Sequence, residues 1–96
     1  MVKKKSDDNE YVLINGIEGK QLRVRKEMID RLVTCRKALG MTQKDLADKM
    51  GVSRPNISRF ESEDYNPTID MIVKVADSMG YDVKIEFVER KTVDSK

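Results

Sequence analysis

The chain has 96 residues, enough for one small domain, and 38% of them are charged. It contains no histidine and one cysteine, so intramolecular disulfides, histidine-based catalytic triads and zinc sites of the usual ligand types are excluded. The sequence also has no phosphate-binding glycine loop, secretory signal or membrane-length apolar run. We therefore expect a cytoplasmic protein that is not an enzyme, binds no cofactor or metal and does not enter a membrane.

The positive charge is concentrated in the middle of the chain. Residues 21–61 contain ten Lys and Arg against five Asp and Glu, a balance of +5, whereas residues 62–96 contain five against eight, a balance of −3. Residues 1–20 contain four of each. A basic segment of this kind is typical of a surface that contacts nucleic acid. A domain this small also buries a modest fraction of its surface, which favours dimerisation.

The first 24 residues are interpreted as a tail followed by short strands. Residues 1–10 (MVKKKSDDNE) are densely charged, and we expect them to be disordered because they cannot bury enough apolar area to offset the entropy of ordering. Residues 11–14 (YVLI) are β-prone and precede Asn15-Gly16, a turn pair that accepts positive φ, which predicts a strand. Residues 21–24 (QLRV) can pair back on this strand, so residues 11–24 form the predicted N-terminal extension.

The helical domain is predicted to span residues 25–80, and its first helix begins near Lys26. Apolar residues then follow one broad helical face, and Gly40 closes the helix as a C-terminal cap. The position of Cys35 on this face indicates a buried small hydrophobe rather than a reactive thiol. The residues of the face are Met28, Ile29, Leu32, Val33, Cys35, Arg36 and Leu39.

Residues 42–61 (TQKDLADKMGVSRPNISRFE) contain two short helical patterns that meet at residues 51–53. A connection this short forces the second helix across the first, as in a helix-turn-helix. Thr42 and Asp45 have the spacing of a capping box, and Gly51 suits the left-handed residue that ends a helix.

The second of these helices begins at Ser53, which is expected to cap it, and Pro55 falls in its first turn, where a missing N–H costs nothing. Ala47, on the first helix, is small enough to lie where the two helices cross most closely. The residues predicted to face the core are Leu46, Ala47, Met50, Ile57 and Phe60.

A fourth helix is predicted from Thr68 to Gly80, after a polar turn that ends in a proline. Its inward residues are expected to be Ile69, Ile72, Val73, Ala76 and Met79. Residues 81–87 (YDVKIEF) then alternate strictly between apolar and charged side chains, which predicts a strand. We place this strand at residues 81–90, where it serves pairing or dimerisation, and expect residues 91–96 to be a tail.

The chain resembles the Xre/Cro-like helix-turn-helix regulators, relatives of the lambda repressors, over residues 36–80. The resemblance is carried by RKALGMTQKDLADKMGVS at residues 36–53 and by NPTID at residues 66–70. It implies DNA binding by the second motif helix and an ion pair between Arg36 and Glu61, for which the alternative is two solvated charges. The family usually adds a fifth helix. The predicted C-terminal strand instead resembles the ending of a minority of family members, and these members are often antitoxins of RelE-like toxins.

Helical geometry predicts which side chains of the second motif helix would meet the bases. If Ile57 points inward, a turn of 100° per residue directs Pro55 and Arg59 outward, with Ser58 at the flank and Arg54 at the leading end. Arginine can form a bidentate fork with guanine, asparagine can pair with adenine, and proline can offer an apolar contact. The predicted base-reading residues are Arg54, Pro55, Asn56, Ser58 and Arg59.

Phosphate contacts are expected from the start of each motif helix, where free backbone N–H groups gather. The candidates are Gln43, Lys44 and Ser53, and for Gln43 the resemblance implies such a contact because family members use the matching glutamine in this way. For every predicted DNA-binding residue, the alternative is an ordinary exposed polar side chain.

The sequence predicts a mainly α fold, a lambda repressor-like helix-turn-helix bundle of four helices with a C-terminal β-strand and a short N-terminal strand. The predicted function is a sequence-specific transcriptional regulator of double-stranded DNA, a repressor that binds a palindromic operator as a homodimer. The alternative is an antitoxin that binds and neutralises a RelE-like toxin partner and autoregulates its operon. The two functions share the helix-turn-helix, so residues 1–24 and 81–96 are what separate them.

Overall fold

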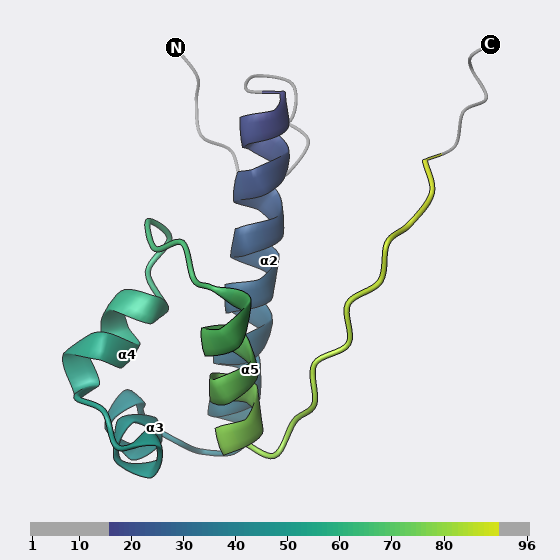
Figure 1. Cartoon of the computed structure of the whole chain (residues 1–96). Coiled ribbons are helices and arrows are strands. Elements are labelled where there is room, and N and C mark those ends of the chain that lie inside the picture. The colour runs from purple at the N-terminus through teal and green to yellow at the C-terminus, as the bar shows by residue number, and fades with distance from the viewer. Residues whose placement is uncertain (1–15, 91–96) are drawn as a thin grey trace, which may run out of the picture.

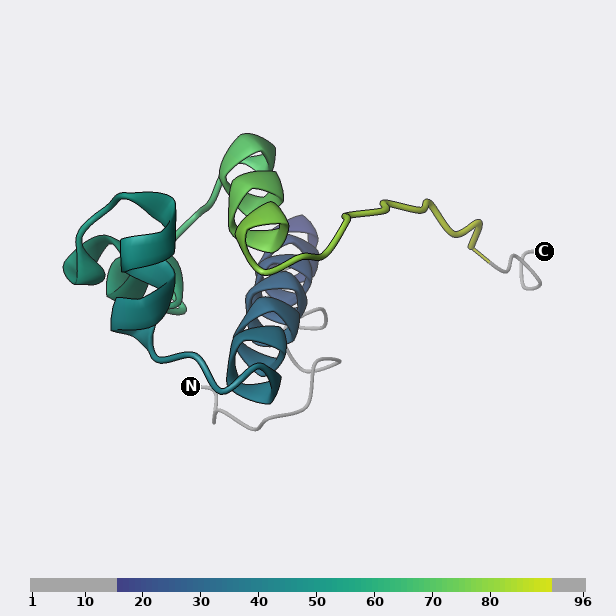
Figure 2. The same ribbon diagram turned by 90° about the horizontal axis from the view of Figure 1, so that it is seen from below.

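The computed structural model describes residues 16–90, and this part of the chain is mainly helical. Its longest helix is α2, and the shorter helices α3, α4 and α5 lie near the C-terminal half of α2 (Figure 1). The bounds of the four helices are Ile17–Ala38 for α2, Gln43–Met50 for α3, Arg54–Phe60 for α4 and Ile69–Ser78 for α5. Both views place α5 beside α2, with α3 and α4 together on one side of the bundle (Figures 1 and 2). The predicted bundle of four helices is therefore confirmed.

All four helices contribute to a single hydrophobic core. Its largest fully buried side chains are Phe60, Leu46, Ile57 and Val75, and the Phe60 ring meets Tyr65 edge to face at 5.9 Å between centroids. Ala47 is 1% exposed, which agrees with its predicted place at the helix crossing. The core consists of Ile29, Leu46, Ala47, Ile57, Phe60, Ile72, Val75 and Met79.

The inward face of α5 differs from the prediction. Val75 is buried, whereas Ile69 and Val73, both predicted to face inward, are 59% and 44% exposed. The buried positions Ile72, Val75, Ala76 and Met79 follow i, i+3, i+4 and i+7 spacing. Val73 lies one residue past this stripe, and Ile69 is the first residue of the helix. Apolar residues lie on both sides of this stripe, so helical spacing alone did not identify which of them are buried.

The helix boundaries of the motif agree with the predicted capping residues. The Thr42 hydroxyl accepts a hydrogen bond from the Asp45 backbone N–H at 3.0 Å, and the Asp45 carboxylate accepts one from the Thr42 N–H at 2.9 Å. Gly51 ends α3 in the left-handed conformation, with φ of 74°. Thr68 caps α5 by accepting from the Met71 N–H at 3.1 Å. Side chains at the boundaries thus fix where these helices begin and end.

The first helix begins earlier than predicted, and the predicted strand at residues 21–24 is wrong. These residues lie within α2, which starts after Gly16, a residue with φ of 59° whose carbonyl accepts the Lys20 N–H at 3.1 Å. Gln, Leu and Arg are good helix formers, and Arg23 pairs with Glu27 at 3.5 Å across one helical turn. The run QLRV is too short for its alternation to outweigh these preferences.

The predicted strand at residues 81–90 is also not found, since no β-strand is present between residues 16 and 90. After Gly80 the backbone is extended and runs away from the side that holds α3 and α4 (Figures 1 and 2). A strand is defined by hydrogen bonds to a neighbouring strand, and the described residues supply no neighbour. The predicted strand at residues 11–14 and the predicted tails at residues 1–10 and 91–96 lie outside the described residues.

Candidate nucleic-acid interface

α4 presents two opposite faces, one to the core and one to the outside. Its inward residues Ile57 and Phe60 are 0% and 1% exposed. The five predicted base-reading residues, Arg54, Pro55, Asn56, Ser58 and Arg59, are all exposed. The structure therefore gathers on one short helix the side chains that helical geometry selected.

Two of these exposed side chains contact each other. The Arg59 guanidinium donates to the Asn56 side-chain oxygen, with 3.2 Å between Nη2 and Oδ1. This contact uses one donor of Arg59 and no hydrogen of the Asn56 amide, so both exposed side chains keep donors for another partner. The two residues are three positions apart on a helix, so their spacing in the sequence could have indicated this pair.

The turn between α3 and α4 holds Ser53 at the start of α4 with an extended backbone, φ −85° and ψ 154°. Its hydroxyl forms no capping hydrogen bond, which differs from the predicted cap. Pro55 lies in the first turn of α4, as predicted. The Ser53 side chain is exposed at the start of this helix, where the helix dipole favours an anion, although Pro55 has no N–H and the Asn56 N–H already donates to the Ser53 carbonyl at 3.0 Å.

Lys44 stands in the first turn of α3 and is exposed. Its ammonium group lies 2.9 Å from the Asp48 carboxylate, one turn further along the helix. The hydrogen bond to Asp48, together with the charge of this carboxylate, raises the pKa of Lys44 above its usual value. Lys44 is therefore a positive charge at neutral pH, held at the surface by an exposed partner.

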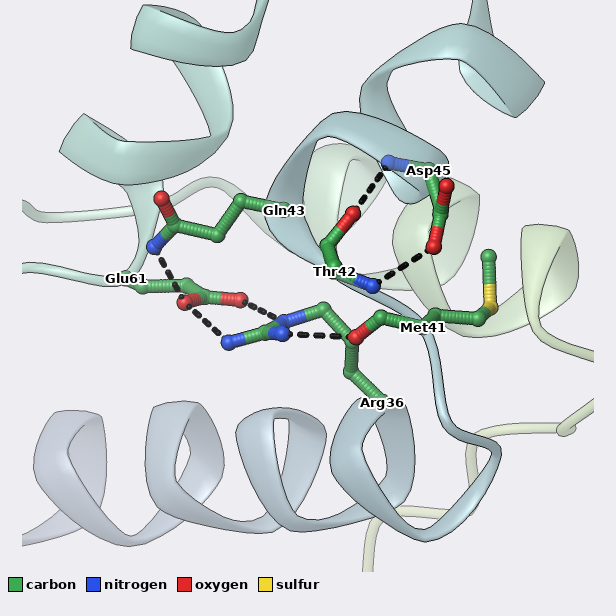
Figure 3. A network of polar contacts seen from close by, with 6 residues as sticks. All are labelled: Arg36, Met41, Thr42, Gln43, Asp45 and Glu61. Carbon is green, nitrogen blue, oxygen red and sulfur yellow. Dashed lines mark hydrogen bonds and ion pairs between the residues drawn. The ribbon is translucent and has the colours of Figure 1, made fainter.

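Gln43 differs from an ordinary exposed polar residue, because its amide takes part in a part-buried network (Figure 3). Its Nε2 atom donates to Glu61 Oε1 at 2.9 Å, a contact that sequence reasoning did not foresee. An amide nitrogen carries two hydrogens, so a second N–H remains for a phosphate. The bond links the start of α3 to the end of α4.

Glu61 lies at the centre of this network. Its carboxylate receives two hydrogen bonds from Arg36, at 2.7 Å from Nε and 3.0 Å from Nη2, and the third guanidinium nitrogen donates to the Met41 carbonyl at 2.8 Å (Figure 3). The side chains of Arg36 and Glu61 are only 8% and 10% exposed. The predicted ion pair is confirmed, and it ties α2 to the end of α4.

These contacts make α4 a fixed helix rather than a loosely attached one. Glu61 follows the last residue of α4, Arg36 stands in the last turn of α2 and Gln43 is the first residue of α3. Bidentate charge-assisted bonds are strong and directional, so they fix the angle at which α4 leaves the core. The network also joins Gln43, one of the predicted phosphate candidates, to the end of the helix that carries the predicted base-reading residues.

The described residues contain neither a metal-binding cluster nor a membrane span. No group of three or more His, Cys, Asp or Glu side chains within residues 16–90 could hold a metal ion. None of the helices in this part of the chain is both long and apolar enough to cross a membrane.

A capped helix, a three-residue turn and a second helix with an exposed polar face define the helix-turn-helix class of proteins. The chain belongs to the family described as Helix-turn-helix (HTH_3), whose model matches residues 32–85. The resemblance to Xre/Cro-like, lambda repressor-like proteins is thereby confirmed.

Two curated relatives carry regulatory names. An uncharacterized HTH-type transcriptional regulator of Haemophilus influenzae is 32% identical over 76 residues, which cover 79% of this chain and 78% of the relative. The cryptic phage CTXphi transcriptional repressor RstR of Vibrio cholerae is 38% identical over 50 residues, which cover 52% of this chain and 45% of RstR.

A solved structure resembles almost the whole chain. It is titled as a toxin-antitoxin module from Streptococcus pneumoniae, with a TM-score of 0.65 and 27% sequence identity. The match covers 92% of this chain and 97% of the other chain.

Proposed function

We propose that the protein is a transcriptional regulator that binds double-stranded DNA sequence-specifically through α4. The observation that carries this proposal is the division of α4 into a buried face and an exposed face with Arg54, Asn56 and Arg59. The Haemophilus influenzae relative is named as a transcriptional regulator and the Vibrio cholerae relative as a transcriptional repressor, which supports the same function.

In this proposal α4 enters the major groove and its side chains read base edges. Arg54 and Arg59 each offer a bidentate fork to guanine, and Asn56 can pair with adenine. Pro55 offers an apolar contact to a thymine methyl group, and Ser58 lies at the edge of the contact. The bond between Asn56 and Arg59 limits the rotamers of both, so less entropy is lost when DNA binds.

Phosphate contacts from three side chains set the position of α4 on the duplex. Lys44 supplies a positive charge, Gln43 its second amide hydrogen and Ser53 an exposed hydroxyl at the start of α4 that makes no capping bond. Such contacts carry affinity but little sequence information. The balance of +5 over residues 21–61 favours the same partner.

The regulator acts as a repressor that binds a palindromic operator as a homodimer. One chain offers one recognition helix, which reads only a half-site, and two-fold symmetry would set two such helices about one DNA turn apart, roughly 34 Å. The Vibrio cholerae relative is named as a repressor, which supports repression rather than activation.

The test compares two alanine variants on two DNA duplexes. One duplex carries the sequence that the full chain selects from a random double-stranded pool, and the other carries random sequence. Arg59→Ala should cost roughly 1–3 kcal/mol on the selected duplex and little on random DNA, because it removes base contacts. Lys44→Ala should weaken both alike and lower the salt slope by about one unit, because it removes a phosphate contact.

Fluorescence anisotropy titrations at several salt concentrations measure these affinities. Arg31→Ala is the matched control, because Arg31 is an exposed arginine on α2 and not on the motif helices. It should leave the ratio of the two affinities unchanged. If Arg59→Ala also left this ratio unchanged, base reading by α4 would be refuted.

The second candidate function is an antitoxin that binds a toxin and autoregulates its operon. The specific observation in favour is the likeness over 92% of the chain to a structure from a toxin-antitoxin module. Co-expression with the protein encoded by the neighbouring reading frame tests it. A complex that survives the Arg59→Ala change would support an antitoxin, and two separately eluting proteins would argue against it.

A further inference from the structure

The segment of residues 81–90, named the arm here, is fixed at its root and exposed beyond it. The Tyr81 N–H donates to the Ala76 carbonyl at 2.9 Å, and the Val83 side chain packs against the core. A hydrogen bond with the Cys35 thiol raises the pKa of the Tyr81 hydroxyl, so the Tyr81 side chain lies against α2. Beyond this root, Ile85, Phe87 and Val88 are 53%, 96% and 89% exposed.

The arm has two chemically distinct faces. In an extended chain successive side chains point to opposite sides, so Val83, Ile85 and Phe87 share one face. Asp82, Lys84 and Glu86 share the other, on which Val88 follows, whereas Glu89 follows Phe87 on the first face. An exposed apolar face beside a row of unpaired backbone N–H and C=O groups is what another strand covers. Among residues 16–90 no strand covers it.

We infer that the arms of two copies of this chain pair as an antiparallel two-stranded ribbon, with Ile85 of each copy facing Ile85 of the other. This inference deepens the proposed function, on which it rests, because it names the surface that joins the two half-site readers. The arm leaves the bundle away from α3 and α4, so this pairing keeps both recognition helices free (Figures 1 and 2).

Charge complementarity selects the register. A two-fold axis through Ile85 places Lys84 opposite Glu86 twice on the polar face and Val83 opposite Phe87 twice on the apolar face. Opposite charges and apolar pairs directly across two strands are both stabilising. Lys84 and Glu86 already lie 2.9 Å apart within one arm, so the ribbon would extend this ion pair into a chain of alternating charges.

The neighbouring registers are all worse. An axis through Lys84 sets lysine against lysine and Asp82 against Glu86, and an axis through Glu86 sets glutamate against glutamate, although like charges across strands are destabilising. An axis through Val83 leaves Phe87 without a partner, because residues before Gly80 are held in α5. A two-fold axis between two residues is not possible in a regular antiparallel ribbon, because residues directly opposite each other must point to the same face. Ile85 is the centre that pairs Lys84 with Glu86 and Val83 with Phe87 at the same time, and its mismatches, Asp82 with Val88 and Tyr81 with Glu89, lie at the two ends of the ribbon.

Cross-linking tests the register in the full-length protein. In a Cys35→Ser background, Ile85→Cys should form an intermolecular disulfide about tenfold faster than Lys84→Cys or Glu86→Cys alone, since only directly opposite residues meet the distance limit for a disulfide. A mixture of Lys84→Cys and Glu86→Cys should cross-link as fast as Ile85→Cys. Equal rates for the three single variants, or a mixture no faster than its components, would overturn the register.

A charge exchange gives a second, independent readout by sedimentation. Lys84→Glu and Glu86→Lys should each weaken the homodimer, raising its dissociation constant roughly tenfold, because each sets like charges opposite each other twice. Mixed together, the two variants should form a heterodimer with wild-type affinity. Homodimers of both variants as tight as the wild type would overturn the inference, as would a full-length chain that stays monomeric at micromolar concentration or binds only a toxin.

These outcomes are separable from failure of the proposed function. If Ile85→Cys cross-links while Arg59→Ala leaves the DNA preference unchanged, the arm pairs but α4 does not read bases. If Arg59→Ala removes the preference while no arm variant cross-links, α4 reads DNA and the arm inference is wrong.

Discussion

At the scale of single residues, Glu61 has the largest structural consequence for DNA reading. Its side chain is 10% exposed, and the carboxylate accepts hydrogen bonds from Arg36 on α2 and Gln43 on α3. Burying a carboxylate is costly unless charge and hydrogen bonds compensate, and here three N–H donors do so. Glu61, which directly follows the last residue of α4, therefore connects α4 to α2 and α3.

Removing either member of the Arg36 and Glu61 pair should therefore be strongly destabilising. We expect Arg36→Ala and Glu61→Ala each to lower the free energy of unfolding by roughly 3 kcal/mol, because each leaves an uncompensated charge in a nearly buried place. The double mutant should cost clearly less than the sum, since both charges are then gone. Urea denaturation of the four proteins measures this coupling.

The exposed pair of Lys44 and Asp48 provides the matched control for this cycle. Its side chains are 71% and 64% exposed, so solvent screens the pair and little coupling is expected. Strict additivity for Arg36 and Glu61, or equal coupling in the two pairs, would contradict a structural role for the buried bridge.

At the scale of elements, the start of α3 depends on an ionised carboxylate. Hydrogen bonds from the Thr42 backbone N–H and with the Thr42 side chain lower the pKa of Asp45 below its ordinary value of 3.8. A group whose pKa is lower in the folded state adds stability above its unfolded pKa and loses this contribution as the pH falls through the folded value. The cap of α3 is therefore weaker in acid than at neutral pH.

We expect Asp45→Asn to lower the melting temperature most at pH 7 and progressively less as the pH falls below the ordinary aspartate value of 3.8. Circular dichroism melts of wild type and variant across this range measure the difference. Asp82→Asn is the control, because Asp82 lies on the arm and caps no helix. A difference for Asp45→Asn that stayed constant with pH would show that its charge adds nothing to the cap.

The same elements show what could be predicted from the sequence and why. α3 and α4 were placed correctly because each boundary has its own local signal: Thr42 with Asp45, then Gly51, then Pro55. The ion pair of Arg36 and Glu61 joins residues 25 positions apart, and it was predicted from the family resemblance rather than from spacing.

The wrong or missing predictions concern features for which the sequence carries no local signal. Residues 21–24 alternate for too short a stretch to distinguish a strand from a helix, and they lie inside α2, where Arg23 pairs with Glu27 one turn further along. The bond between Gln43 and Glu61 depends on the crossing of two helices, which no periodicity reports. The arm alternates like a strand, but a strand also needs a neighbour, and its own residues do not say which one.

At the scale of the whole molecule, the arm connects oligomeric state to operator affinity. Removing the chain after Val83 keeps the root of the arm, in which Val83 packs on the core and the Tyr81 N–H is bonded to Ala76. The truncated chain should stay folded, because the described residues that it loses, 84–90, are all exposed, but should be monomeric by light scattering. Affinity for the full palindrome should then fall by on the order of 100-fold, since two linked half-site contacts become independent.

Affinity for a single half-site is the control, because α4 and the residues that hold it are untouched by this truncation. Affinity for a half-site should be the same for both proteins, and the salt slope on the full palindrome should fall toward that of one half-site. If the truncated protein still eluted as a dimer, the dimer interface would lie on the helices and not on the arm. An unfolded one would mean that residues beyond Val83 belong to the core, against the 96% exposure of Phe87.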